Sequence, residues 1–259
     1  MTARFAGLVS LALCLASATG AAAQGLHPAE VYKLRLEYRE FRPSLTGEVQ
    51  KGFGDVPGTL LDLETDLGLE KKRTFEIVAT LKLAAGHKLR GSYTPFSYRG
   101  DLTARRTFDF DDSRFERFTR VVTDLKGGYY TGEYEWDFIH GSTGYLGLLV
   151  GAKVIDTDAL IVGPNEGIRE QETIRGPIPV VGATTRVYTG RLSFEGEFAG
   201  LSIGKRGFLF ELDTSARVHI SDRLAIGAGY RLVSSRGEED LKFFRLRLRG
   251  WQFGLEISL

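Results

Sequence analysis

The sequence predicts an all-β fold, a closed antiparallel up-and-down transmembrane β-barrel of about ten strands, with about 8–12 as the possible range. Three observations lead to this fold. Apolar and polar residues alternate with a period of two in many segments. The connectors between these segments are short on one side and mostly longer on the other. The number of segments is even, so both chain ends fall on the side of the short connectors.

Composition excludes several other classes. The chain has 34 Lys and Arg against 33 Asp and Glu, a net charge of +1, which argues against nucleic acid as a partner. With 26% charged residues and no long apolar run after Gln24, a bundle of membrane helices is excluded. The only cysteine is Cys14, near the amino terminus, so disulfides and thiolate metal sites are not expected. The 32 glycines favour strands and tight turns.

The amino terminus is typical of an export signal. An apolar run over 5–15 is followed by small residues, with Ala21 and Ala23 at the spacing that a signal peptidase requires. The run is shorter than the ~20 residues of a membrane-spanning helix. We therefore expect residues 1–23 to be a cleaved signal peptide and residues 24–259 to form a single barrel domain.

The alternation locates the strands. In 73–84, for example, large apolar side chains alternate with Glu76, Thr80 and Lys82. The ten expected strands are 30–42, 73–84, 88–99, 118–139, 145–157, 178–188, 192–203, 207–220, 223–235 and 242–259. The short connectors are 85–87, 140–144, 189–191 and 221–223. The connectors on the other side are 43–72, 100–117 and 158–177, with shorter ones at 204–206 and 236–241.

The polar faces of the strands carry charges of both signs, while the apolar faces are long enough to cross a bilayer. We therefore expect the apolar faces to contact lipid and the charges to pair inside the lumen. The expected lumen charges are Arg35, Glu37, Arg39, Glu133, Glu135, Glu195, Glu197, Glu211, Asp213, Arg217, Arg231, Arg245 and Arg247. A soluble periplasmic barrel of the lipocalin kind, with these charges outside, is the alternative.

The last strand contains an apparent change of phase. Arg245, Arg247 and Arg249 stand at positions that are apolar after Gly250. A β-bulge at Gly250 would place these arginines inside and Leu248 outside.

The end of the chain carries the most specific motif. Gln252, Gly254, Ile257 and Leu259 match, in order, a polar residue, a glycine and two large apolar residues. This pattern resembles the C-terminal β-signal of bacterial outer-membrane proteins, although most of these end in Phe or Trp rather than Leu. The expected assembly signal comprises Trp251, Gln252, Phe253, Gly254, Leu255, Ile257 and Leu259.

The resemblance extends over the chain from Gln24 onward, to the small outer-membrane β-barrels of the OmpA/OmpX/OmpW-like porin superfamily, without identifying a member. It implies export through the periplasm, insertion into the cell outer membrane by the barrel-assembly machinery, and contact with outer-membrane lipid and lipopolysaccharide. It also implies that the last strand pairs with the first, which leaves no open edge in lipid.

No catalytic set is evident in the sequence. His87 and His140 fall in short turns and His27 precedes the first strand, while His219 and Ser221 lie at the short-turn end of strand eight. A nucleophile needs a base and an orienting group within reach, and none is clear. We therefore expect no enzyme activity, cofactor or metal centre.

One loop suggests a possible cation site. Asp62, Glu64 and Asp66 alternate with leucines in the first long loop, and carboxylates are the ligands that hard divalent cations prefer. Solvated loop charges are the alternative interpretation.

The expected function is a structural or surface-binding outer-membrane barrel, or a narrow pore, with a largely filled lumen. An outer-membrane enzyme acting on lipid A or peptides is one alternative. A carrier of small apolar molecules is another, since Gly147, Gly151, Gly227 and Gly229 on inner faces could leave local space.

Overall fold

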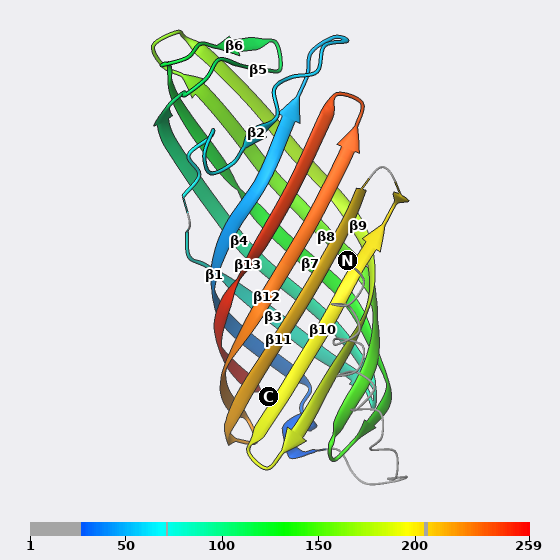
Figure 1. Ribbon diagram of the computed structural model, residues 1–259. Helices are drawn as coiled ribbons and strands as arrows, with labels where there is room; N and C mark the ends of the chain where they lie inside the picture. Colours follow the sequence, from blue (N-terminus) through cyan, green and yellow to red (C-terminus); the bar gives the residue numbers. More distant parts are fainter. Residues whose placement is uncertain (1–26, 71, 205–206) are drawn as a thin grey trace, which may run out of the picture.

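Ten antiparallel strands close into one barrel, as the sequence predicts (Figure 1). The computed structural model describes residues 27–70, 72–204 and 207–259, so the expected signal peptide lies outside the described residues. The last strand pairs with the first in an unbroken register from Arg35↔Ser258 to Lys51↔Lys242. This closure satisfies the backbone hydrogen-bonding groups of both end strands, as a sheet in lipid requires.

Each wall strand pairs with its neighbours in the chain, which is the up-and-down topology. A short 3-10 helix, η1 (Pro28–Glu30), precedes the barrel, and β2, β5 and β6 belong to the long loops. The wall consists of β1 (Leu34–Lys51), β3 (Thr74–Ala84), β4 (His87–Thr103), β7 (Arg120–Gly141), β8 (Gly144–Gly163), β9 (Ile168–Thr189), β10 (Leu192–Ser202), β11 (Gly207–Ser221), β12 (Leu224–Glu239) and β13 (Lys242–Ser258). The loop elements are β2 (Leu61–Asp62), β5 (Phe108–Phe110) and β6 (Ser113–Phe115).

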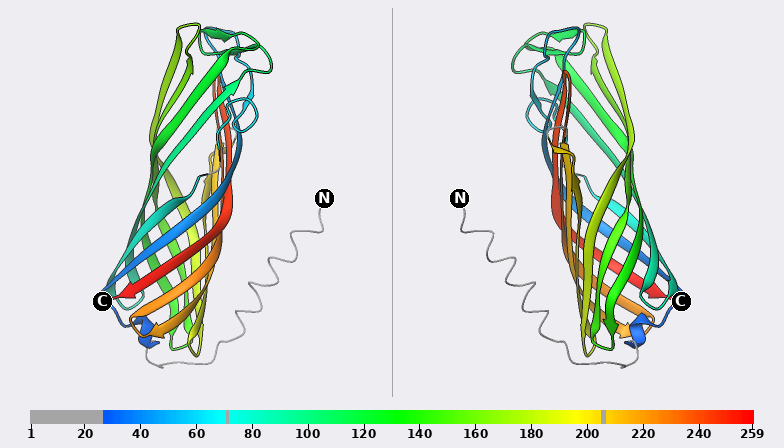
Figure 2. Two further views of the ribbon diagram at one scale, coloured as in Figure 1. Left: turned by 90° about the vertical axis from the view of Figure 1, so that its left-hand side faces the viewer. Right: turned by 90° about the vertical axis from the view of Figure 1, so that its right-hand side faces the viewer.

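Several strands extend further toward the long loops than the sequence predicts. β1 continues to Lys51, and most of the predicted loop 158–177 is the upper part of the β8–β9 hairpin. Figure 2 shows this hairpin rising at the end of the barrel opposite to η1 and the carboxyl terminus. We call the part of the barrel on the long-loop side the head.

β9 extends beyond the end of β10, its neighbour on the other side. Its ladder with β10 ends at Val181↔Gly200, so Pro177 and Pro179 lie where β9 pairs with β8 alone. Proline lacks the N–H that a strand paired on both sides would use. The two prolines are therefore compatible with a one-sided ladder.

Among the described residues, no helix is long and apolar enough to cross a membrane.

The head has an apolar interior. Leu61 on β2, Phe115 on β6 and Val121 on β7 are fully buried in one cluster. The segment around Leu67 folds back against the wall at Gly100, where any Cβ would overlap the carbonyl oxygen of Leu67. The remaining buried members are Leu45, Leu63, Leu67, Leu69, Tyr98, Ala104, Phe108 and Ile161. The long loops thus fill the head instead of leaving it open.

The prediction of a bulge at Gly250 is wrong. Gly250 pairs in register with Pro43 on β1 and with Arg231 on β12, and the phase of β13 is the same on both sides of it. Leu246 and Leu248 pack inward against the apolar cluster. What changes along β13 is the environment: the interior turns from charged to apolar in the head, and the exterior turns from lipid-facing to polar.

Candidate functional site

The lower half of the lumen, next to the short turns, holds a network of buried charges. Nζ of Lys88 on β4 lies 2.7 Å from Oε1 of Glu135 and 2.8 Å from Oδ2 of Asp137, both on β7. Nη2 of Arg217 on β11 lies 2.8 Å from Oε2 of Glu37 on β1. These pairs form because alternate residues of every strand point inward, so charges of opposite sign from different strands meet in a small volume.

The network continues upward to the level where the head begins. Arg231 on β12 contacts Glu211 at 2.5 Å and Glu76 at 3.0 Å. Lys153 on β8 lies 2.6 Å from Glu211 as well. Two voids among the charged groups measure about 20 and 10 Å³. Each has room for about one water molecule, far less than a solute path needs.

The amino-terminal segment closes the short-turn end. η1 inserts Glu30 into the lumen, where it is only 3% exposed. Its carboxylate lies 2.9 Å from Arg35, within 4 Å of Lys82, Lys88 and Arg186, and accepts a hydrogen bond from Tyr188. Glu30 therefore gives four cations of the strands a shared carboxylate partner.

Most of the lumen charges expected from the sequence lie inside the barrel, buried or nearly so. The expectation is wrong for Arg245 and Arg247, which point outward from β13 and are exposed. The inward residues of the expected set are Arg35, Glu37, Arg39, Glu133, Glu135, Glu195, Glu197, Glu211, Asp213, Arg217 and Arg231.

Glu30 and Glu256 are among the network members that lie outside the expected set of lumen charges. Glu30 precedes the first strand, where no alternation marks it as inward. Glu256 contacts Arg186 at 2.5 Å, and its place in phase with Gln252 and Gly254 could have indicated an inward side chain.

Charges also join opposite sides of the mouth at the head. Nζ of Lys51, at the end of β1, lies 2.5 Å from Oε2 of Glu172 on β9, and Lys242 at the start of β13 contacts the other oxygen at 2.7 Å. Burial alone would raise the pKa of Glu172, but the hydrogen bonds from Lys242 and Lys51 outweigh it and hold the pKa below its ordinary value. We call these three residues the rim clasp.

The possible cation site in the first long loop is not supported. Oδ1 of Asp62 accepts hydrogen bonds from the N–H groups of Glu64 and Thr65, and Oδ2 of Asp66 contacts Arg106 at 2.7 Å. These carboxylates therefore stabilise a turn. Across residues 27–70, 72–204 and 207–259, no group of three or more His, Cys, Asp or Glu side chains is placed to hold a metal ion.

All four histidines lie at the short-turn end. Nε2 of His219 is 2.9 Å from Oγ of Ser193, a contact that the sequence does not predict. Ser193 is fully buried and His219 nearly so, and His27 stacks on the neighbouring Tyr188. The hydroxyl and the imidazole form a hydrogen bond with each other inside the barrel wall.

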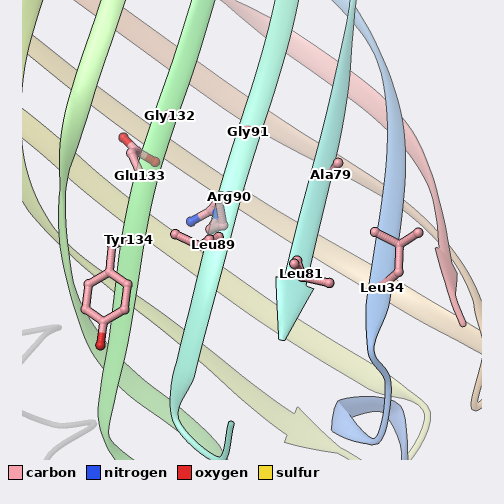
Figure 3. Close-up of a pocket in the computed structure, with 9 residues that line it drawn as sticks. All are labelled: Leu34, Ala79, Leu81, Leu89, Arg90, Gly91, Gly132, Glu133 and Tyr134. Carbon is pink, nitrogen blue, oxygen red and sulfur yellow. The ribbon is translucent and has the colours of Figure 1, made fainter. Parts of the chain in front are cut away.

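The lipid-facing wall has an open hollow, of about 440 Å³, between β1, β3, β4 and β7 (Figure 3). Its floor is the row Ala79, Gly91 and Gly132, which are paired in register across the three strands. Leu89 and Tyr134 border it. Because the floor is apolar and faces outward, the hollow fits the chains of bilayer lipid.

The inner glycines offer no space for a carried molecule. A Cβ at Gly151, Gly227 or Gly229 would meet a backbone carbonyl oxygen of the next strand, and one at Gly147 would meet the Asp137 carboxylate. These positions are closely packed, which opposes the carrier alternative.

The expected assembly signal forms the end of β13. Leu36 on β1 pairs with Ile257, Phe41 with Gln252, and Leu259 accepts hydrogen bonds from the backbone of Lys33 and Leu34. Trp251, Phe253, Leu255, Ile257 and Leu259 are exposed on the outer wall, while Gln252 and Gly254 face inward. Recognition of this segment by an assembly machinery stays a prediction.

The wider comparisons place the fold. No protein-family model and no curated protein matches the chain. The outer membrane protease OmpT of Escherichia coli is similar in structure with a TM-score of 0.60, at 10% sequence identity over 88% of this chain and 97% of that one. The transport unit of the autotransporter AIDA-I from the same organism matches with a TM-score of 0.44, at 10% identity over 98% of each chain. Ail of Yersinia pestis matches with a TM-score of 0.35, at 11% identity over 86% of this chain and 99% of that one.

At this low identity the likeness concerns the fold alone, and it agrees with the apolar outer wall and the charged lumen. The side chains that face outward between the short turns and the head include Ile77, Leu89, Val150, Phe194 and Ile257, all of them exposed. Such a belt suits lipid and not water. The chain has the fold of the small outer-membrane β-barrel proteins.

Proposed function

We propose that this outer-membrane barrel is a structural, surface-binding protein that conducts no solute and catalyses no reaction. The observation that carries the proposal is closure of the interior at two levels. Paired charges fill the lumen between the short turns and the head, and folded loops fill the head with apolar side chains. An open pore would need a continuous wet path through both levels.

The two closures have different physical origins, and each is costly to open. Separating buried ion pairs leaves charges without a partner in a medium of low polarity. Expelling the head loops would expose Leu61 and Phe115, which are fully buried, to water. The narrow-pore alternative requires both events together, so the geometry favours the closed barrel.

The enzyme alternative lacks a histidine at the outer mouth. The head presents carboxylates and cations there, while every histidine of the chain lies at the other end. Incubation of the refolded protein with peptide libraries and with lipid A should leave both unchanged. Turnover that a substitution in the head abolishes would contradict the proposal.

Planar-bilayer recording of the refolded protein tests closure directly. We expect no steady current steps after insertion, with a general porin added to the same bilayer as a positive control. Insertion is verified separately by heat-dependent migration of the barrel in gels after extraction of the bilayer. Uniform, repeated current steps from inserted protein would contradict the proposal.

A further inference from the structure

The outer wall changes from apolar to cationic within one step along β13. Its outward residues are Leu255, Phe253 and Trp251 up to Gly250, and then Arg249 and Arg247. Trp251 is 62% exposed and packs edge-on against Tyr230 of β12 at 5.4 Å between ring centroids. Tryptophan and tyrosine favour the boundary between the acyl chains and the head groups. The two arginines therefore lie at the level of the lipid head groups.

Two outward cations on the far side of the barrel each have an acidic partner. Arg120 on β7 contacts Asp101 on β4 at 2.6 Å, and Arg175 on β9 contacts Asp156 on β8 at 2.7 Å. Cross-strand pairs of this kind neutralise each other on an exposed sheet face. Such positions have little charge left for a ligand.

Arg247 and Arg249 differ from those cations. The cross-strand neighbours of Arg247 are Thr46 on β1 and Ser234 on β12. Those of Arg249 are Ser44 and Leu232. Within the described part of the chain, neither arginine has an ion pair or a hydrogen bond from its side chain.

The surrounding charges do not neutralise the two arginines. Arg245 next to them is paired with Glu48 at 3.2 Å, and Arg42 is paired with Glu40 at 2.8 Å. The acidic groups of this face are thus already engaged, and Arg247 and Arg249 leave a local positive surplus. We call Arg247, Arg249, Ser44, Thr46 and Ser234 the seam patch, since they lie where β13 closes onto β1 and beside β12.

The chemistry of the seam patch suits a phosphate ligand. A guanidinium group binds phosphate through two parallel hydrogen bonds, and serine and threonine hydroxyls donate further ones. The two arginines lie about 7 Å apart along the strand, since alternate residues are two rises of ~3.4 Å apart. The patch can therefore engage a head group that carries more than one phosphate.

We propose that the seam patch binds the phosphate groups of a phosphorylated glycolipid in the outer leaflet, of the lipopolysaccharide class. Its acyl chains then lie along Trp251, Phe253 and Leu255 below the patch. This inference rests on the proposed location in the outer membrane and names a lipid that the barrel holds there. Closure of the lumen is a separate matter, since the patch is on the outside of the wall.

The test measures binding of purified lipopolysaccharide to the detergent-solubilised, refolded barrel through the fluorescence of Trp251, in a Trp136→Phe background. We expect the variant Arg247→Ser/Arg249→Ser to bind lipopolysaccharide about thirtyfold more weakly. This factor combines a loss of about fivefold in affinity for each arginine, which is the contribution of one basic residue at an anionic membrane surface. The matched control is Arg120→Ser/Arg175→Ser, which also removes two outward arginines, and its affinity should be unchanged. Arg247→Lys/Arg249→Lys should lose less than the serine variant, because it keeps the charge but not the paired geometry.

Dephosphorylated lipopolysaccharide provides the second arm, and it should bind wild type and the serine variant equally. Inorganic phosphate at millimolar concentration should not compete, because it lacks the acyl chains. Heat-dependent migration in gels shows that each variant is folded. Equal affinity of wild type and the serine variant would overturn the proposal, and so would an equal loss in the control. Neither result changes the outcome of the conductance recording, so the two proposals fail separately.

Discussion

Arg90 on β4 and Glu197 on β10 meet across the lumen, with Nη1 of Arg90 2.6 Å from Oε2 of Glu197. The strands β7, β8 and β9 separate them along the wall. A direct contact between such distant strands means that side chains, and not water, occupy the centre of the barrel at this level. The pair therefore tests whether the lumen is held closed by charge.

Replacing Arg90 by methionine should destabilise the barrel by about 3–5 kcal/mol, because Glu197 would keep a buried charge without its nearest partner. The double variant Arg90→Met/Glu197→Met should recover most of this loss, since it removes both charges. Urea unfolding in detergent measures the free energies of unfolding of wild type, the single variant and the double variant. The exposed Arg120→Met, which breaks a surface pair, should cost no more than about 1 kcal/mol. A double variant as unstable as the single one would show that the charges do not act as a pair.

Replacing Glu30 by glutamine should destabilise the short-turn end by about 3–5 kcal/mol, because Arg35, Lys82, Lys88 and Arg186 would lose the carboxylate that they surround. Glutamine keeps the size of the side chain, so the loss reports charge. The thermal midpoint in detergent measures it. The control is Glu48→Gln on the outer wall of β1, which should change the midpoint little. Equal effects of the two substitutions would mean that Glu30 does not compensate the cations.

Replacing Gly100 by alanine should displace the folded loop that fills the head, because the new Cβ would overlap the backbone at Leu67. The expected result is rapid proteolytic cleavage within 52–73 in a barrel that otherwise stays closed. Gly91→Ala on the same strand is the matched control, since a Cβ there meets only an ordinary contact with the Thr131 carbonyl, at 3.7 Å. Resistance of Gly100→Ala to protease would show that the loop does not depend on this close approach.

The rim clasp should make the head sensitive to acid. The pKa of Glu172 is lower in the folded protein than its ordinary value near 4.3, so the folded state binds this proton more weakly than the unfolded state. The stabilisation is therefore present above pH ~4.3 and is lost as the pH falls through the lower folded-state pKa.

Glu172→Gln should accordingly lower the thermal midpoint at pH 7 but not below the folded-state pKa. Measuring the thermal midpoints of wild type and variant in parallel between pH 7 and pH ~3 gives the difference between them at each pH. Glu238→Gln serves as control, because it breaks an exposed pair between Glu238 and Arg236, both on β12. A constant difference at every pH would mean that Glu172 acts through packing and not through its charge.

The sequence by itself determined the barrel, its ten strands and the side from which the short turns connect them. Period-two alternation is a local property: an inward residue such as Glu37 and an outward one such as Leu36 are distinguished by their immediate neighbours. The closure of β13 onto β1 followed from the terminal motif around Gly254 and from the even number of strands. These features need no knowledge of which strands face each other across the lumen.

Only the tertiary structure decided what each face meets along the length of a strand. Arg247 and Leu248 alternate in the same way above Gly250 as Trp251 and Gln252 do below it. Above Gly250, however, the outer face is polar instead of lipid-facing, and the inner face is apolar instead of charged. Folded loops from distant parts of the chain make the interior of the head apolar, and no local pattern reports them. For the same reason the sequence missed Glu30, whose partners come from β1, β3, β4 and β9. Alternation fixes which residues share a face, and the environment of that face is a property of the assembled barrel.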